Sequence, residues 1–255
     1  MLTVCSRTHP GSVRTINEDA VLWDAELGLL TVADGMGGHN AGEVASSLAV
    51  DAVRSFLEKS AASDDFTWPF GLDPKMSFAA NRLMTALKIA NRRVFHASEE
   101  HADYNGMGTT VVAALAEGSH VSFTSVGDSR IYTLQGHELR QLTKDDSWVV
   151  MLQKESGLDA SAFDKHPMRH VLTAVVGARP ELDVKVEELA LVDGQTIMFC
   201  SDGLHGALPD SVILSILEEE RDLERAADTL VETAVKRDGS DNVTILLARY
   251  SQPPV

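Results

Sequence analysis

The sequence predicts an α+β protein in which two antiparallel β-sheets pack face to face, with pairs of helices on the outside. The first observation behind this prediction is the order of the expected elements: strands, two helices, many strands, two helices and a strand. The second is that helices and strands do not alternate, as they would around a parallel, doubly wound sheet. With 255 residues, 44% of them hydrophobic, the chain is large enough to bury such a core.

The first half of the chain combines short strands with two amphipathic helices. Apolar segments between turn residues predict strands at residues 2–6, 20–24 and 27–33. A helix is expected over about 41–59, because apolar residues recur every four positions from Val44 to Phe56. The same spacing predicts a second helix over about 75–98, after a loop that contains Gly and Pro.

From Gly108 onward the apolar pattern changes to the period that is typical of strands. A meander of antiparallel strands is expected at residues 109–117, 120–126, 129–135 and 137–143. The stretch 144–178 is less regular and contains the short helix-like piece "SWVVMLQKE". The last predicted elements are strands at 183–189, 195–201 and 242–250 and helices at 208–219 and 222–237.

The charge balance argues against nucleic acid as a partner. The chain has 22 Lys and Arg residues against 38 Asp and Glu residues, a formal net charge of −16. Binding to a phosphate backbone needs clustered cations instead. The excess of carboxylates either serves solubility or includes groups that converge on bound cations.

The sequence gives no sign of secretion or of a membrane anchor. The two cysteines, Cys5 and Cys200, form no spacing motif and predict no disulfide. The N-terminal residues lack the regions of a signal peptide, and no apolar run approaches the length of a membrane span. A cytoplasmic, monomeric protein is therefore expected.

The loop "VADGMGGHNAGE" places Asp34 between a predicted buried strand and a predicted helix. As a phosphate cradle the loop is a poor match, because a P-loop needs a lysine and none is present. Gly35 and Gly37 begin a dinucleotide fingerprint, but position 40 is Asn instead of the third glycine. A nucleotide-binding module is thus disfavoured.

Further apolar runs also lie beside an aspartate. Asp128 lies in "FTSVGDS", Asp202 in "IMFCSDG" and Asp241 in "DGSDNVTILL". Each of them alone is explained as a turn residue or a helix cap. If the strand ends meet at one rim of the sandwich, however, these carboxylates converge. Mg²⁺ or Mn²⁺ would then offset their repulsion.

The segment "GSVRTINED" contains Arg14 and the acidic pair Glu18 and Asp19. An arginine beside a carboxylate–metal cluster is well shaped to bind a phosphate with two hydrogen bonds. An equally good explanation is a salt bridge from Arg14 to Glu18 or Asp19.

Taken together, the motifs resemble those of a known family. In chain order they are "GSVRTINED", "VADGMGGHNAGE", "GMGTT", "VGDSRIY", "LTKDDSWV", "HPMRHVLTAVVG", "FCSDGLHGAL" and "GSDNVTI". This order resembles that of the PP2C-type (PPM family) metal-dependent serine/threonine phosphatases, most of all their bacterial branch. The resemblance implies an αββα sandwich, in agreement with the element order. It implies one domain over residues 1–250, followed by a short tail at 251–255.

The resemblance implies a site for two Mn²⁺ or Mg²⁺ ions. Asp34 would bridge the two ions, and the backbone carbonyl of Gly35 would bind one of them. Asp202 and Asp241 would complete the other site. Asp128 is similar to the ligand of a third ion in bacterial relatives, where it would be shared with Asp202.

The resemblance also implies roles around the metal ions. Glu18 and Asp19 would hold metal-bound water or support the ligands from behind. Arg14 would bind the substrate phosphate. Residues 145–172 would form a flap over the site that influences the choice of substrate.

The chain departs from the family pattern at two positions. Met36 stands where eukaryotic relatives have a histidine proposed as the general acid, a departure that bacterial relatives commonly share. Because a thioether cannot transfer a proton, the leaving alkoxide would be protonated by a metal-bound water or by another group. His39 is interpreted as a loop residue and not as this acid. Asp146 stands where the usual "T-x-D-H-S" has histidine, at the start of the flap.

The sequence thus predicts an enzyme that hydrolyses phosphoserine and phosphothreonine in proteins by in-line attack of a metal-bridging hydroxide. Its partners would be phosphorylated proteins, including a cognate serine/threonine kinase that it opposes. The alternative is a catalytically inactive PPM-fold module that signals by binding. Such a module is expected to lack several metal-binding aspartates, whereas Asp34, Asp202 and Asp241 are all present.

Overall fold

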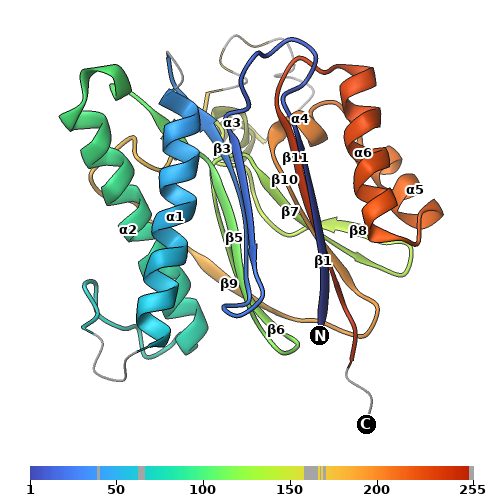
Figure 1. Cartoon of the computed structure of the whole chain (residues 1–255), viewed down its shortest axis with the longest axis horizontal. Coiled ribbons are helices and arrows are strands. Elements are labelled where there is room, and N and C mark those ends of the chain that lie inside the picture. The colour runs from blue at the N-terminus through green and yellow to red at the C-terminus, as the bar shows by residue number, and fades with distance from the viewer. Residues whose placement is uncertain (39–40, 63–66, 158–165, 167, 169–170, 253–255) are drawn as a thin grey trace.

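Two antiparallel β-sheets lie face to face at the centre of the structure, and helices cover both outer faces (Figure 1). The computed structural model describes residues 1–38, 41–62, 67–157, 166, 168 and 171–252. Within these ranges the main helices and strands follow the order expected from the sequence, and the predicted αββα sandwich is confirmed.

One sheet contains five strands in the order β1, β11, β10, β7 and β8. Their bounds are Leu2–His9 (β1), Val243–Tyr250 (β11), Thr196–Cys200 (β10), Arg130–Gln135 (β7) and Glu138–Gln141 (β8). Neighbouring strands are antiparallel, and Leu247 of β11 lies opposite both Cys5 and Met198. The first and the last strand of the chain are therefore neighbours, as the dark blue and red strands in Figure 1 show.

The other sheet has the strand order β2, β3, β5, β6 and β9, with β4 paired to β3. The bounds are Asp19–Asp24 (β2), Leu29–Met36 (β3), Val111–Glu117 (β5), His120–Val126 (β6), Val186–Ala190 (β9) and Gly108–Thr109 (β4). The strand predicted at 109–117 is thus divided at Thr110. The reason is that Thr110 leaves the regular ladder and binds Asp34 through both its backbone and its side chain.

Two pairs of helices cover the sheets from outside (Figure 1). Helices α1 (Ala41–Ala61) and α2 (Phe78–Glu100) pack on the sheet that contains β3. Helices α5 (Asp210–Glu219) and α6 (Leu223–Arg237) pack on the sheet that contains β11. The apolar faces predicted for α2 and α6 are buried, whereas in α1 the predicted Val44 and Leu48 are only partly buried and Ala45 and Ala49 take the central positions.

The strand β3 shows how the layers are held together. Leu29 belongs to the core under α1 and α2, whereas Leu30 and Val32 face the second sheet. Phe199 and Leu246 meet them from that sheet. Because β3 is buried on both sides, it reads as one continuous apolar run and ends at the polar rim of the sandwich.

The structure corrects the sequence prediction in several smaller points. Helix α2 begins at Phe78 and not near residue 75, because the Ser77 side chain accepts a hydrogen bond from the Ala80 N–H and caps it. Pro209 is the N-cap of α5 and does not lie in its first turn. The sequence did not predict the short helix α4 (Asp202–His205) or the 3₁₀ helix Ala102–Tyr104.

Both cysteines are buried and free. Burial raises the pKa of the Cys5 thiol to about 11 and that of the Cys200 thiol to about 12. At neutral pH both thiols are therefore protonated and act as small apolar groups.

Candidate active site

A cavity of about 430 Å³ lies at the end of the sandwich, beside the ends of β3 and β10 and the start of β11. Its lining includes the predicted site residues Arg14, Glu18, Asp34, Gly35, Asp128, Asp202 and Asp241. Asp19 does not line the cavity and lies next to Asp34 on the neighbouring strand. The structure therefore brings together carboxylates that are up to about 220 residues apart in the sequence.

Asp34 is held in place by the residues on either side of the break between β4 and β5. Its N–H donates to the Thr110 hydroxyl at 3.2 Å, and its carbonyl accepts from the Thr110 N–H at 2.8 Å. The Thr109 hydroxyl donates to the same carbonyl at 2.8 Å. On the other edge of β3, Asp19 lies directly opposite Asp34. The main chain of Asp34 is thus fixed while its carboxylate is left to the cavity.

Gly35 and Gly42 allow the end of β3, the start of α1 and Glu18 to approach one another closely. The Gly35 N–H donates to the Glu18 carbonyl at 3.1 Å. A Cβ on Gly35 would lie 2.0 Å from the Gly42 carbonyl oxygen, and a Cβ on Gly42 would lie 2.4 Å from Glu18 Oε1. Only glycine fits at either position. The glycine loop is thus a packing device that holds Glu18 at the cavity.

Asp202 and Asp241 come from two segments that touch each other. Asp202 is the first residue of α4, directly after β10, and Asp241 lies just before β11. Gly203 makes the contact possible, because a Cβ there would lie 2.0 Å from the Asn242 carbonyl oxygen. The start of α4 therefore places Asp202 beside the segment that carries Asp241.

Asn242 joins this segment to the loop that carries Arg14 and Glu18. Its side-chain amide donates to the carbonyls of Pro10 and Ile16, each at 3.0 Å. Its Oδ1 accepts from the Glu18 N–H at 2.7 Å. The sequence analysis did not single out Asn242. The available signal was its place beside an aspartate in the motif "GSDNVTI".

Carboxyl groups in the interior of the site have raised pKa values. Burial raises the pKa of Asp34 well above its usual range, and the Asp19 and Asp202 carboxylates raise it further. Burial also raises the pKa of Glu18 and takes that of Asp19 to about 7. Carboxylates this close together cannot all ionise, so the metal-free site retains protons that a divalent cation would displace.

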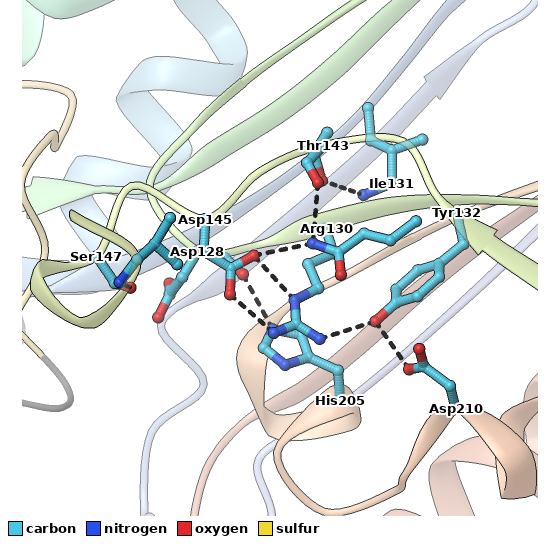
Figure 2. Close-up of polar contacts among 11 residues, drawn as sticks. Asp128, Arg130, Ile131, Tyr132, Thr143, Asp145, Ser147, His205 and Asp210 are labelled. Carbon is cyan, nitrogen blue, oxygen red and sulfur yellow. Dashed lines mark hydrogen bonds and ion pairs between the residues drawn. The ribbon is translucent and has the colours of Figure 1, made fainter. Parts of the chain in front are cut away.

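Asp128 lies in the turn between β6 and β7 and faces the same cavity. Burial and the Asp202 carboxylate raise the pKa of Asp128 to about 7. The Nε2 atom of His205 lies 2.9 Å from the Asp128 backbone carbonyl, as Figure 2 shows. Burial lowers the pKa of His205 to about 4, so the ring is neutral near pH 7 and donates this hydrogen bond through Nε2.

Beside this group, Arg130 connects β7 with the start of the predicted flap (Figure 2). Its guanidinium donates to both carboxylate oxygens of Asp145, at 2.9 and 2.8 Å, and to the Tyr132 hydroxyl at 2.9 Å. Tyr132 in turn donates to Asp210 at 3.2 Å. The sequence analysis quoted the motifs that contain Arg130 and Asp145 but could not pair them.

Arg14 makes an ion pair that the sequence analysis did not anticipate. Its Nη2 atom lies 2.9 Å from Asp241 Oδ2, so the expected partner, Glu18 or Asp19, was wrong. The Arg14 side chain remains 49% exposed and lines the cavity. Its guanidinium is therefore accessible to an anion that enters the site.

Met36 lines the cavity at the end of β3 and has no proton to donate. His39 lies outside the described residues. The same holds for 158–165, 167 and 169–170 within the predicted flap 145–172. The described part of the flap includes α3 (Trp148–Ser156), which Ser147 caps by accepting from the Val150 N–H.

Asp146, the departure from the family motif, closes the base of the flap. Its N–H donates to the Gly127 carbonyl at 2.8 Å, and the Gly127 N–H donates back to Asp146 Oδ2 at 3.1 Å. The Asp146 carbonyl accepts from the Thr173 N–H at 2.7 Å. One residue thus joins both ends of the flap to the turn that carries Asp128.

The donor atoms at the cavity suit a hard divalent cation. Asp19 Oδ1 is buried without a hydrogen-bond partner among the described residues, while Oδ2 accepts from the Ser201 hydroxyl at 2.8 Å. Among the residues that the structure describes, no three His, Cys, Asp or Glu side chains are arranged so that side chains alone could hold a metal ion. The remaining ligands would be backbone oxygen and water, a set that fits Mg²⁺ or Mn²⁺, since Mg²⁺ usually retains several waters.

Comparisons with known proteins agree on one family. A family model described as protein phosphatase 2C matches residues 11–247. The serine/threonine phosphatase Stp of Listeria monocytogenes is 35% identical over 248 residues, which cover 94% of this chain and 93% of the relative.

Solved structures show the same similarity. The catalytic domain of the serine/threonine phosphatase PstP, known from Mycobacterium tuberculosis, was solved in complex with two manganese ions. It matches with a TM-score of 0.81 and 33% identity, covering 98% of this chain and 99% of that one. The serine/threonine phosphatase of S. agalactiae matches with a TM-score of 0.86 and 29% identity, covering 99% and 100%.

Proposed function

The chain belongs to the protein phosphatase 2C family, and from this premise we propose how its residues hydrolyse phosphoserine and phosphothreonine in proteins. It is a metal-dependent serine/threonine phosphatase, like its relatives, which it resembles over nearly its whole length. These similarities support an enzyme and not the inactive binding module, the alternative left by the sequence.

Two divalent cations would be held by Asp34, Asp202, Asp241 and the Gly35 carbonyl. The observation that carries this assignment is the convergence of these groups on one cavity, where burial and like charge raise the pKa of Asp34. When bound, the cations would lower the pKa of a water molecule and offset negative charge on the phosphoryl group.

Glu18 and Asp19 would support this site from two sides. Glu18 lines the cavity and would hold water there. Asp19 lies behind Asp34 and is oriented by the Ser201 hydroxyl, so its negative charge would act through Asp34. Without metal, the Asp19 carboxyl has a pKa of about 7 and is mostly protonated below that pH. Beside a bound cation it would ionise.

Arg14 would bind the substrate phosphate. It shares Asp241 with the proposed cation site, and a guanidinium released from that carboxylate can bind two phosphate oxygens side by side. Met36 lines the cavity but supplies no proton to the leaving alkoxide, which would be protonated by a metal-bound water or by another group.

We extend the proposal to a third cation at Asp128 and Asp202. The support is that both carboxylates line one cavity and that Asp202 raises the pKa of Asp128. Isothermal titration with Mn²⁺ would give one ion fewer for Asp128→Ala than for the unaltered protein. An equal number of ions in both would exclude Asp128 as a ligand.

Several points stay predictions: Mn²⁺ or Mg²⁺ as the bound ion, a kinase among the substrates, a cytoplasmic location and a monomeric state. So does a single domain over residues 1–250, which an apolar core shared by both sheets supports. Among the described helices, none is long and apolar enough to cross a membrane.

Asp34→Asn and Asp202→Asn test the assignment of the site. With Mn²⁺, each variant should turn over p-nitrophenyl phosphate and a phosphothreonine peptide about 100-fold more slowly or worse, since each loses a charge that holds the cations. Asp193→Asn is the matched control, because Asp193 is exposed and precedes β10, whereas Asp202 follows the other end of that strand. Full activity in either site variant would show that the assignment is wrong.

A further inference from the structure

A series of hollows leads from the active-site cavity to helix α2. The active-site cavity shares Leu172 and Val175 with a second hollow of about 270 Å³. That hollow shares Glu181 and Leu182 with a third one of about 170 Å³. The segment 172–182 is therefore a continuous wall between the site of hydrolysis and the third hollow, which we call the α2 hollow.

Two cations and one aromatic ring form the α2 hollow. Lys88 and Arg92 lie four residues apart on α2, so they share one face of the helix. The Lys88 ammonium lies 5.5 Å and the Arg92 guanidinium carbon 4.4 Å from the centre of the Phe70 ring. The ring attracts both cations weakly and holds them near each other.

The positive charge of the α2 hollow is not balanced locally. Among the described residues, neither Lys88 nor Arg92 forms an ion pair, although the chain carries a net charge of −16. Glu181 also lines the hollow but is not within ion-pair distance of either cation. An anionic group placed between the two cations would relieve their repulsion.

The wall of the path is fixed before any ligand binds. The Gly177 N–H donates to Asn91 Oδ1 at 2.8 Å, and the Asn91 amide donates to the carbonyls of Arg179 and Pro180 at 2.9 and 3.4 Å. Asn91 itself is buried in α2, between the two cations in sequence. A bound peptide would therefore meet a preorganised surface, which lowers the entropy cost of binding.

We propose that the α2 hollow binds an acidic segment of the phosphoprotein substrate while the phosphorylated residue occupies the active-site cavity. The inference rests on the proposed function and adds a preference for substrates with acidic residues several positions away from the phosphorylated one. Arg92 and Lys88 would bind the acidic residues of the substrate, since an arginine guanidinium binds carboxylates with two hydrogen bonds.

The test compares two phosphothreonine peptides, one with Glu several residues away from the phosphothreonine on both sides and one with Gln at the same positions. The unaltered protein with Mn²⁺ should show about fivefold higher kcat/KM for the Glu peptide, mainly through KM, as expected for exposed charge pairs. The preference should shrink at about 0.5 M NaCl, because salt screens such pairs.

Arg92→Glu should abolish or invert the preference, and Lys88→Glu should reduce it. Arg93→Glu is the matched control, because Arg93 is exposed on the same helix, does not line the hollow, and changes the charge equally. If circular dichroism shows that the charge reversal Arg92→Glu prevents folding, Arg92→Gln replaces it in the test. The small substrate p-nitrophenyl phosphate does not extend to the hollow, so all these variants should turn it over at the normal rate.

The outcomes separate the two proposals. Equal kcat/KM for both peptides in the unaltered protein, or the same loss in Arg93→Glu as in Arg92→Glu, would overturn the role of the α2 hollow. Absence of Mn²⁺-dependent turnover of p-nitrophenyl phosphate by the unaltered protein would instead overturn the proposed active site.

Discussion

Two groups of buried charge lie side by side at the end of the sandwich, and they are balanced in different ways. Arg130 and Asp145 neutralise each other within the chain, through two hydrogen bonds of 2.9 and 2.8 Å. In the second group, Asp34 lies beside the Asp19 and Asp202 carboxylates, which together with burial raise the pKa of Asp34. The first group is complete in the protein alone, whereas the second requires protons or cations from solution.

Breaking the internally balanced pair should have the largest effect on stability. Arg130→Ala leaves the mostly buried Asp145 carboxylate without its cation and should lower the free energy of unfolding by about 3 kcal/mol. Urea denaturation without metal measures this loss. Arg130→Ala combined with Asp145→Asn should recover part of it, because no unpaired charge remains. A loss below about 1 kcal/mol in the single variant would contradict the comparison.

The externally balanced group should respond to metal and pH instead. The pKa values of Asp19 and Asp128 are raised to about 7, so the folded metal-free protein binds more protons than the unfolded chain between about pH 4 and 7. The stability that the protonated Asp19 and Asp128 side chains contribute to the folded protein is complete below about pH 4. It is lost as the pH rises through 7. A cation displaces these protons and binds more tightly at higher pH.

Saturating Mn²⁺ should therefore raise Tm more at pH 8 than at pH 5.5. The same Mn²⁺ concentration is used at both pH values and is about 100 times the Kd at pH 8, where it corresponds to about 2.7 kcal/mol, or roughly 5–10 °C for a chain of this size. Differential scanning calorimetry at both pH values measures the shift. Asp34→Asn, which lacks the central carboxylate, is the control and should show a much smaller gain. An equal gain at both pH values would mean that these carboxyl groups do not take up the metal.

The smallest effect is expected at Asp146, where the two groups meet. Asp146→Ala removes the acceptor of the buried Gly127 N–H and should cost about 1 kcal/mol in urea denaturation. Asp146→Asn keeps an oxygen at that position and should lose less than half as much. If the two substitutions were equally destabilising, the hydrogen bond to Gly127 would not be the reason.

The sequence predicted the members of the externally balanced group better than those of the internal pair. Asp34 and Asp202 stand beside long apolar runs, and a sandwich brings strand ends to one rim, so local pattern and fold class together predicted that they converge. The pairing of Arg130 with Asp145 depends on how the chain returns after β8, which no local pattern specifies. Motif similarity identified the segments but not their contacts.

The partner of Arg14 shows the same limit at longer range. Sequence proximity favoured Glu18 or Asp19, but the chain topology places β1 beside β11 and so brings Asp241 to Arg14. Asn242, which fixes that arrangement, is an ordinary polar residue until its three hydrogen bonds are known. Contacts between distant segments depend on strand order, and the element pattern fixes only the layers.

The glycine loop after Asp34 also determines how this enzyme can change over evolutionary time. At Gly35 and Gly42 any side chain would collide with backbone or with Glu18, so these two positions do not tolerate substitution. At Gly38 an added Cβ meets no atom of the described residues within 4 Å, and Met36 lines the cavity. New chemistry, including a residue able to protonate a leaving group, can therefore be introduced at Met36, while Gly38 tolerates a side chain, and neither change touches the close contacts at Gly35 and Gly42.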